Sequence, residues 1–211
     1  KGKPGLMGGS SFIPRFRNLK KVEKTGFIKG YCVGIGSGGS ARPNFFPLYG
    51  EELQAKLDSY ERSCVNGSIF GERVARFENH VRINKDVRDA YGIPALHIEA
   101  RDSDNETRLR KDAADTIEEW FHEAGWEIIN KTDQVNPPGY SIHEVGTCRM
   151  GDDPKKSVLN KWCQSHDIKN LFVVDGASFV TCGWQNPTMT ILALAMRASE
   201  HLADEMRQGS V

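Results

Sequence analysis

Three short motifs near the carboxyl end constrain the fold of this chain more than any other feature. They are His143-x-x-Gly-Thr-x-x-Met-Gly, Asp175-Gly176 and Asn186-Pro187-Thr188. The apolar residues 171–174 before the second motif predict a short buried strand that ends in a turn. The third motif opens a long apolar segment with an Asn-Pro pair, which predicts a final helix over residues 187–207.

This order of motifs resembles the carboxyl-terminal signature of the glucose-methanol-choline (GMC) oxidoreductases, which use FAD to oxidise alcohols and sugars. The resemblance is strongest from Ser141 to about Ala203 and extends more weakly back through Asn79. It implies an α+β fold in two domains. Residues 1–140 resemble a substrate-binding domain built on an antiparallel sheet with helices. Residues 141–211 resemble the carboxyl-terminal strand and helix of an FAD-binding α/β domain.

The resemblance also implies roles for residues of the three motifs. His143 matches the catalytic histidine of the family, and Asn186 matches its partner position, which is His or Asn among members. A His-Asn pair is that of the subgroup with choline-oxidising and pyranose-oxidising enzymes. The positions that line FAD in the family match Asp175, Gly176, Asn186, Pro187 and Thr188.

The residue types themselves suit alcohol oxidation, because a hydride leaves a carbon more readily when the hydroxyl proton leaves as well. A neutral imidazole, with an ordinary pKa of about 6.5, can take that proton at physiological pH. Asn186 is expected to cap the final helix, whose free amide groups can stabilise an anion such as a reduced flavin. Structural alternatives exist: His143 as a hydrogen-bonded structural histidine, Asn186 as a cap alone, and Asp175-Gly176 as an Asx turn.

A second glycine-rich stretch, residues 34–39, has the G-x-G-x-x-G spacing of a dinucleotide-binding turn. Such a turn needs a helix after its third glycine, and Pro43 and Pro47 oppose a helix here. We therefore interpret the stretch as a glycine-rich hairpin or loop. Because the sequence holds no better phosphate-binding motif, we expect the isolated chain to bind FAD weakly or not at all.

The remaining sequence predicts further strands and helices. The first 50 residues mix Gly, Pro and short apolar runs, which favours strands and turns, and a helix is expected over residues 51–62. Antiparallel strands are expected in the middle region, including residues 95–100. A capping box at Ser103 opens a second helix that Gly125 is placed to end. An Asn-Pro-Pro-Gly stretch at residues 136–139 marks a seam between two structural units.

Composition narrows the range of partners. Lys and Arg number 28 and Asp and Glu number 28, so no excess of positive charge favours nucleic acid or an anionic membrane. No apolar run approaches the roughly 20 residues of a membrane span. The five cysteines and the other histidines lack the spacing of a disulfide framework or a metal site. The expected partner is a small alcohol or sugar, with no metal, no nucleic acid and no membrane span.

The start of the chain, without Met or a signal sequence, suggests the interior of a longer protein. We interpret the chain as a fragment of an FAD-dependent dehydrogenase or oxidase acting on CH–OH groups of sugars, polyols or other alcohols. Its missing partner is the amino-terminal FAD-binding part of the same protein, and the isolated chain is expected to be inactive. The alternatives are a non-catalytic carbohydrate-binding module with the same fold and a nicotinamide-linked reductase that uses residues 34–39.

Overall fold

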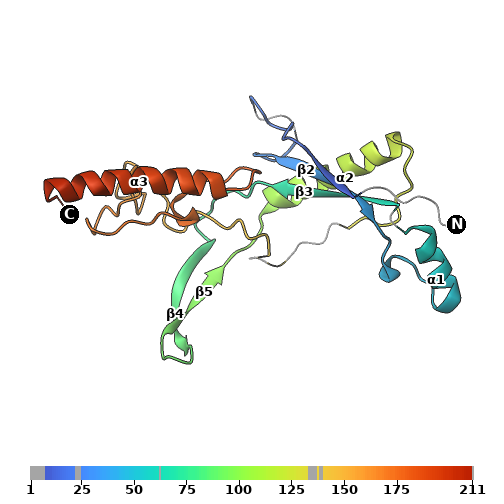
Figure 1. The fold of residues 1–211 in the computed structure, drawn as a ribbon, viewed down its shortest axis with the longest axis horizontal. Coiled ribbons are helices and arrows are strands. Elements are labelled where there is room, and N and C mark those ends of the chain that lie inside the picture. The colour runs from blue at the N-terminus through green and yellow to red at the C-terminus, as the bar shows by residue number, and fades with distance from the viewer. Residues whose placement is uncertain (1–7, 22–24, 62, 133–136, 138–139, 211) are drawn as a thin grey trace. The chain divides into compact units, whose positions relative to one another are not determined.

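The computed structural model describes residues 8–21, 25–61, 63–132, 137 and 140–210. The chain divides into two compact units, one from residues 1–72 and 103–134, the other from residues 73–102 and 135–211. Small antiparallel sheets and three α-helices in the described part give an α+β architecture, as the sequence predicts (Figure 1). The domain boundary at residue 140 stays a prediction, and most of the seam at residues 136–139 lies outside the described residues.

The first unit contains a three-stranded sheet with β2 (Tyr31–Gly39) at its centre. β2 pairs antiparallel with β1 (Gly9–Ile13) on one side and with β3 (Cys64–Gly71) on the other (Figure 1). The register sets Val33 opposite both Ile13 and Ile69, so three β-branched side chains lie side by side across the sheet. Such cross-strand pairs stabilise the sheet.

The glycine-rich residues 34–39 lie inside β2, so they do not form a dinucleotide-binding turn, and their interpretation as a hairpin or loop is wrong. Glycine permits close packing here. A Cβ atom on Gly34 would lie 3.2 Å from the Ser68 hydroxyl oxygen and 3.4 Å from the ring of Phe12. The space lets the rings of Phe12 and Phe70 approach, with centroids 5.9 Å apart. Strands on both sides supply the hydrogen-bond partners that keep the stretch extended.

Helix α2 (Asp104–Glu123) packs against this sheet and begins with the predicted capping box. The Ser103 amide donates to the Glu106 carboxylate at 2.8 Å, and the Ser103 hydroxyl oxygen accepts from the Asn105 amide at 3.2 Å. Gly125 follows the helix end with a φ of 75°, which confirms the predicted stop. The shared core contains Phe27, Tyr31, Val33, Leu109 and Ala113. A shorter helix, α1 (Gly50–Ser59), covers most of the helix predicted over residues 51–62, after a 3-10 turn at Pro43–Phe45.

A buried tyrosine ties the sheet to α2. The Tyr31 side chain is fully buried, and its hydroxyl donates to the Asp112 carboxylate at 2.6 Å and lies 3.3 Å from the Thr116 hydroxyl. Arg17 also donates to Asp112, at 3.0 Å. Burial, reinforced by the hydrogen bond to Asp112, raises the pKa of Tyr31 to about 12.

This tyrosine gives a testable dependence of stability on pH. Because the pKa of Tyr31 is raised to about 12 by folding, its contribution is complete below about pH 10, the ordinary value, and is lost as the pH rises through the folded value. The free energy of unfolding should fall by about 2 to 3 kcal/mol over this interval through Tyr31. Urea titrations between pH 9 and 12 measure it. Tyr31→Phe should lack this component and Tyr49→Phe, at an exposed position, should keep it; parallel curves for wild type and Tyr31→Phe would contradict the prediction.

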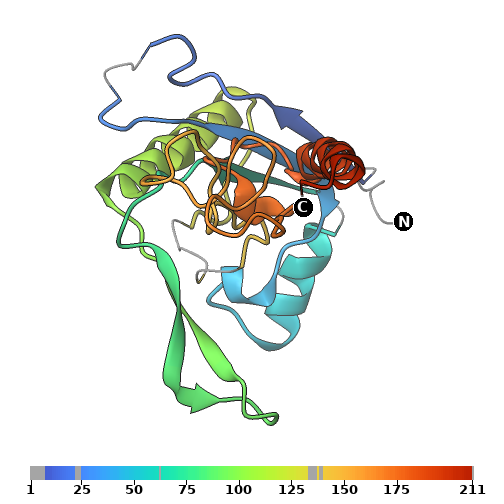
Figure 2. The ribbon, with the colours of Figure 1, turned by 90° about the vertical axis from the view of Figure 1, so that its left-hand side faces the viewer.

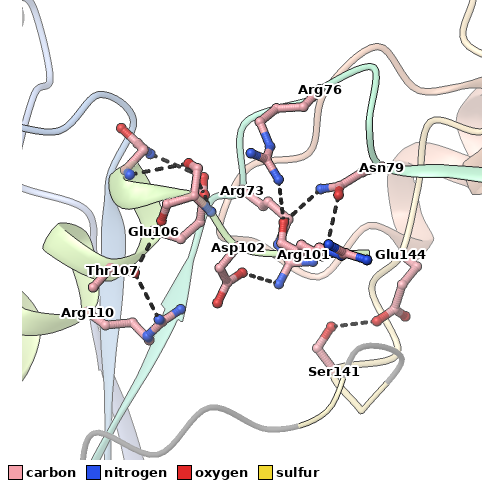
Figure 3. Close-up of polar contacts among 12 residues, drawn as sticks. Arg73, Arg76, Asn79, Arg101, Asp102, Glu106, Thr107, Arg110, Ser141 and Glu144 are labelled. Carbon is pink, nitrogen blue, oxygen red and sulfur yellow. Dashed lines mark hydrogen bonds and ion pairs between the residues drawn. The ribbon is translucent and has the colours of Figure 1, made fainter. Parts of the chain in front are cut away.

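The second unit contains a twisted hairpin of β4 (His80–Arg88) and β5 (Pro94–Glu99), which confirms the antiparallel strands predicted for the middle region (Figure 2). At its base the Arg101 amide donates to the Asn79 side-chain oxygen at 2.9 Å, and the Asn79 amide group donates to the Arg101 carbonyl at 3.0 Å (Figure 3). Arg76 donates to the same carbonyl at 2.8 Å. These bonds close the open end of the hairpin.

Helix α3 (Thr188–Gln208) covers nearly the range predicted for the final helix, and Gly209 ends it with a φ of 69°. Both ribbon views place residues 150–180 alongside α3 (Figures 1 and 2). The short strand predicted at residues 171–174 is absent. Phe172 makes a single bridge to Gln164, and Leu171 and Val174 are exposed. A strand needs a continuous partner, and the described residues offer this segment only one bridge, so its local β preference is not realised.

Candidate active site

Backbone hydrogen bonds join the histidine motif to the Asp-Gly motif. The amide of Gly146 donates to the Gly176 carbonyl at 3.1 Å, and the amide of Cys148 donates to the Ala177 carbonyl at 2.9 Å. The amide of Met150 continues the series to the Ser178 carbonyl at 2.9 Å. The motifs are far apart in sequence, and these three bonds fix them side by side.

Gly176 is the point where all three motif segments meet. A Cβ atom on Gly176 would lie 3.1 Å from a methyl carbon of Val145 and 3.6 Å from the Cδ1 atom of Ile191. Val145 belongs to the histidine motif and Ile191 to the first turn of α3. The absence of a side chain at this buried glycine therefore permits the histidine segment and the helix to approach the same backbone.

His143 directly follows a bend with an unusual backbone. The Ser141 hydroxyl donates to the Glu144 carboxylate at 3.0 Å, so the two residues bracket the histidine (Figure 3). Ile142, immediately before it, has a φ of 55°, a conformation that costs a β-branched residue free energy, and its side chain is 84% exposed. His143 is half-buried, and the described residues provide no hydrogen-bond partner for its imidazole. The structure thus restrains the backbone of this residue and leaves its ring nitrogens available.

Asp175 caps a short helical turn. Its carboxylate accepts from the Ala177 amide at 2.8 Å, at the start of the 3-10 helix η2 (Gly176–Ser178). The Ser178 hydroxyl donates to the Asp175 carbonyl at 2.9 Å. The Asx-turn alternative is therefore realised. Because the Asp175 carboxylate is exposed and uses one oxygen in this bond, the other oxygen remains open to a ligand.

The start of α3 differs from the prediction in one detail. Pro187, in a helical backbone conformation, is the capping residue, Thr188 is the first helical residue, and no side chain caps the helix. Asn186 lies one position further out and is exposed, so its expected role as the N-cap is wrong. The Pro187 carbonyl accepts the first helical bond, from the Ile191 amide at 3.0 Å, as the carbonyl of a capping residue does.

Asn186 and Pro187 line a shallow hollow of about 280 Å³. Met150 and Phe179 lie on its wall, and Thr190 and Leu194 contribute from α3. His143 is not among the lining residues. The structure therefore brings the histidine motif to this hollow through Met150, and it brings Asn186 there directly. Among the described residues no group of His, Cys, Asp or Glu side chains is arranged to hold a metal ion.

The match to known proteins agrees with this arrangement. The family model described as GMC oxidoreductase matches residues 75–195, more than half of the chain. The chain belongs to the GMC oxidoreductase family. The matched region includes the hairpin, α2, all three motifs and the first turns of α3. The resemblance of the three motifs is thereby confirmed, and GMC oxidoreductases are flavoproteins that generally depend on FAD.

Individual GMC relatives are similar over a similar stretch. The chain is 42% identical to 2-methyl-1,2-propanediol dehydrogenase of Mycolicibacterium austroafricanum, over 64% of this chain and 24% of that protein. It is 35% identical to the fructose dehydrogenase large subunit of Gluconobacter japonicus, over 62% of this chain and 24% of that protein. It is 34% identical to paromamine 6'-oxidase of Streptomyces fradiae, over 61% of this chain and 24% of that protein. The chain thus spans about a quarter of the length of these relatives.

Several residues of this region were not predicted. The Ser141–Glu144 contact has the same Ser-x-x-Glu spacing as the capping box at Ser103, and that spacing is the signal that could have identified it. Met150 is a fixed position of the histidine motif, but its place in the hollow could not be predicted, because it depends on hydrogen bonds between segments far apart in sequence. None of the helices in the described part of the chain has the length and apolar character that crossing a membrane requires.

Proposed function

We propose that this chain is the carboxyl-terminal part of an FAD-dependent oxidoreductase that oxidises CH–OH groups of sugars, polyols or other small alcohols. The observation that carries the proposal is the convergence of the three motif segments at Gly176, through hydrogen bonds from Gly146, Cys148 and Met150. The relatives named as dehydrogenases of a diol and of fructose support the substrate class. The amino-terminal part of the same polypeptide supplies the remainder of the cofactor site.

In this proposal His143 is the base that takes the proton of the substrate hydroxyl. Its ring nitrogens have no partner among the described residues, so one of them can accept that proton without breaking an existing bond. The Ser141–Glu144 contact and the left-handed Ile142 restrain the backbone on either side of it. A base placed at the reacting hydroxyl contributes about 10²- to 10⁴-fold to the rate of such a step.

The residues at the junction fit an FAD molecule in the chemistry of their donors and acceptors. FAD, when bound, accepts the hydride that leaves the substrate carbon. The open oxygen of Asp175 can accept a hydroxyl hydrogen bond, and Thr188 can donate one. The first amides of α3 lack a side-chain cap and favour an anionic group. Gly176 and Pro187 shape the backbone between these groups without adding charge.

Asn186 is proposed to bind the substrate oxygen. Its side chain is exposed on the wall of the hollow and does not cap α3, so its amide group can donate to a ligand there. A donor aimed at an oxygen that gains negative charge lowers the barrier to proton removal. His143 and Asn186 would then act on the same hydroxyl, one as acceptor and one as donor.

The proposal is tested with the full-length polypeptide. It should purify with flavin absorbance, and anaerobic mixing with a panel of sugars, diols and simple alcohols should bleach that absorbance for at least one of them. Flavin that no CH–OH compound reduces would contradict the proposal. Sugar binding without flavin reduction would instead indicate a carbohydrate-binding module. Reduction of a bound nicotinamide cofactor would indicate a nicotinamide-linked reductase.

An Asn186→Asp variant tests the placement of this residue beside the reacting groups. Its carboxylate should disfavour a negatively charged flavin, lowering the flavin potential by roughly 30 mV or more, about 1.4 kcal/mol for two electrons. The same charge favours protonated imidazole, so the pH profile of flavin reduction should move to higher pH. Redox titration and a pH series of reduction rates measure both. Asn130→Asp, an equal change in an exposed loop, should alter neither; an Asn186→Asp enzyme with wild-type potential and profile would exclude the proposed placement.

A further inference from the structure

Residues 151–173 form a loop with its own buried centre. Leu159 and Cys163 are fully buried, and the buried Gln164 side chain donates to the Lys169 carbonyl at 2.8 Å. The Asn160 side-chain oxygen accepts from the amide of Trp162 at 2.8 Å and from that of Gln164 at 3.3 Å. The loop therefore has a packed and hydrogen-bonded centre of its own.

One end of this loop is joined to the histidine motif. The Val158 amide donates to the Arg149 carbonyl at 3.1 Å, and the Gly151 amide donates to the Leu159 carbonyl at 2.8 Å. Arg149 and Gly151 flank Met150, whose amide is bonded to η2. The loop is therefore hydrogen-bonded on both sides of Met150 to the segment that follows His143.

The tip of the loop contacts the middle of α3 through Trp162. The indole stacks on the His201 imidazole, with ring centroids 4.6 Å apart and planes 18° from parallel. The Arg197 guanidinium carbon lies 5.6 Å from the Trp162 centroid, and Arg197 also donates to the Lys161 carbonyl. Trp162 thus engages two successive turns of the helix, through stacking and cation–π attraction.

The residue that follows this tryptophan has a strained backbone. Cys163, next to it, is fully buried and has a φ of 60°, which residues other than glycine seldom adopt. Such a conformation persists only where the surrounding structure imposes it, and it often occurs at functional positions. In the described part of the second unit the non-glycine residues with positive φ are Cys163, beside Trp162, and Ile142, beside His143.

These contacts attach α3 to the motif segments at two points. Near its start, Ile191 packs at Gly176, and further along, Arg197 and His201 hold Trp162. The points are separated by roughly 9 to 15 Å along the axis, at about 1.5 Å per residue. A helix attached at one point can change its orientation about that point, whereas attachment at two points fixes the direction of its axis.

We propose that Trp162 is a positioning residue that fixes the direction of α3, and with it the amide groups at the start of the helix, relative to the segment that carries His143. The inference rests on the proposed function in one respect: those amides face the anionic cofactor. The contacts of Trp162 with the helix lie at Arg197 and His201, away from the helix start. Its effect passes through the stacked His201 and Arg197 to the helix start.

The experiment compares Trp162→Ala, Trp162→Phe and the control Trp126→Ala in the full-length, flavin-loaded polypeptide. Trp126 lies in the first unit, after α2, so the control removes a tryptophan away from the loop. Trp162→Ala should speed amide hydrogen exchange in residues 188–196 about tenfold. It should also lower the flavin potential by roughly 30 mV. Trp162→Phe keeps a ring that can stack, so its exchange rates and flavin potential should stay close to the wild-type values. Trp126→Ala should change neither the exchange rates nor the potential.

The inference would be overturned if Trp162→Ala had wild-type amide exchange rates in residues 188–196 or a wild-type flavin potential. So would a Phe variant as impaired as the Ala variant, because a stacking role requires partial rescue. Failure of the proposed function is recognised separately, since the wild-type protein would then not be reduced by any alcohol. Hydrogen exchange needs no substrate. Even if the proposed function fails, unchanged exchange rates in residues 188–196 of Trp162→Ala would therefore still overturn the role of Trp162.

Discussion

Replacing His143 with alanine in the full-length polypeptide should lower the rate of flavin reduction by substrate about 10²-fold or more and leave FAD bound. The change removes the proton acceptor while keeping the backbone. It breaks no hydrogen bond among the described residues, and the Ser141–Glu144 contact can remain. Stopped-flow reduction at saturating substrate measures the rate, and flavin absorbance after gel filtration measures retention.

A matched control separates the chemical role of this histidine from general damage. His122→Ala replaces an exposed histidine on the last turn of α2 and should reduce flavin at the wild-type rate. A His143→Ala rate within a few fold of wild type would exclude an essential base at this position. A compound with an acidic hydroxyl should lose less rate in the variant, because its proton needs less assistance to leave.

A Gly176→Val substitution should impair the enzyme as severely as loss of the base. A Cβ atom at this position would already lie 3.1 Å from Val145 and 3.6 Å from Ile191, and two further methyl groups have no space. The histidine segment or α3 must therefore shift. Because a displacement of about 1 Å can cost about 10²-fold in rate, we expect a loss of that size in flavin reduction, together with weaker FAD retention.

The size of this effect should follow the size of the side chain. Gly176→Ala introduces only the close 3.1 Å contact and should lose much less activity than the valine variant. Gly8→Val is the control, since a Cβ atom there meets no atom within 4 Å. Thermal unfolding of each variant shows whether the protein still folds. Wild-type kinetics in a folded Gly176→Val enzyme would contradict the convergence of the three segments at this glycine.

Elements specified by neighbouring residues could be predicted from the sequence. The capping box at Ser103 and the stop at Gly125 set both ends of α2, because caps act within one turn of the helix. The family match likewise confirmed the three motifs as a signature. The start of α3 differs by one residue, because local preference favours Asn186 as the cap with Pro187 as the first helical residue, whereas in the structure Pro187 is the capping residue.

Elements specified by distant partners could not be predicted. The glycines of residues 34–39 favour a hairpin or loop, yet strands on both sides keep these residues extended. Residues 171–174 have the composition of a strand and lack a continuous partner in the described part of the chain. The junction at Gly176 also depends on contacts between remote segments, so the sequence indicated its residues and not their meeting.

The three backbone bonds between residues 146–150 and 176–178 have a kinetic consequence. They join the ends of a span of chain that cannot close until the residues between them have collapsed, and closure of such a span costs entropy that only later contacts return. The burial of Leu159 and Cys163 within the span provides those contacts. We therefore expect the junction to form late in folding, and we expect a partly unfolded chain to lose it before it loses the locally determined helices.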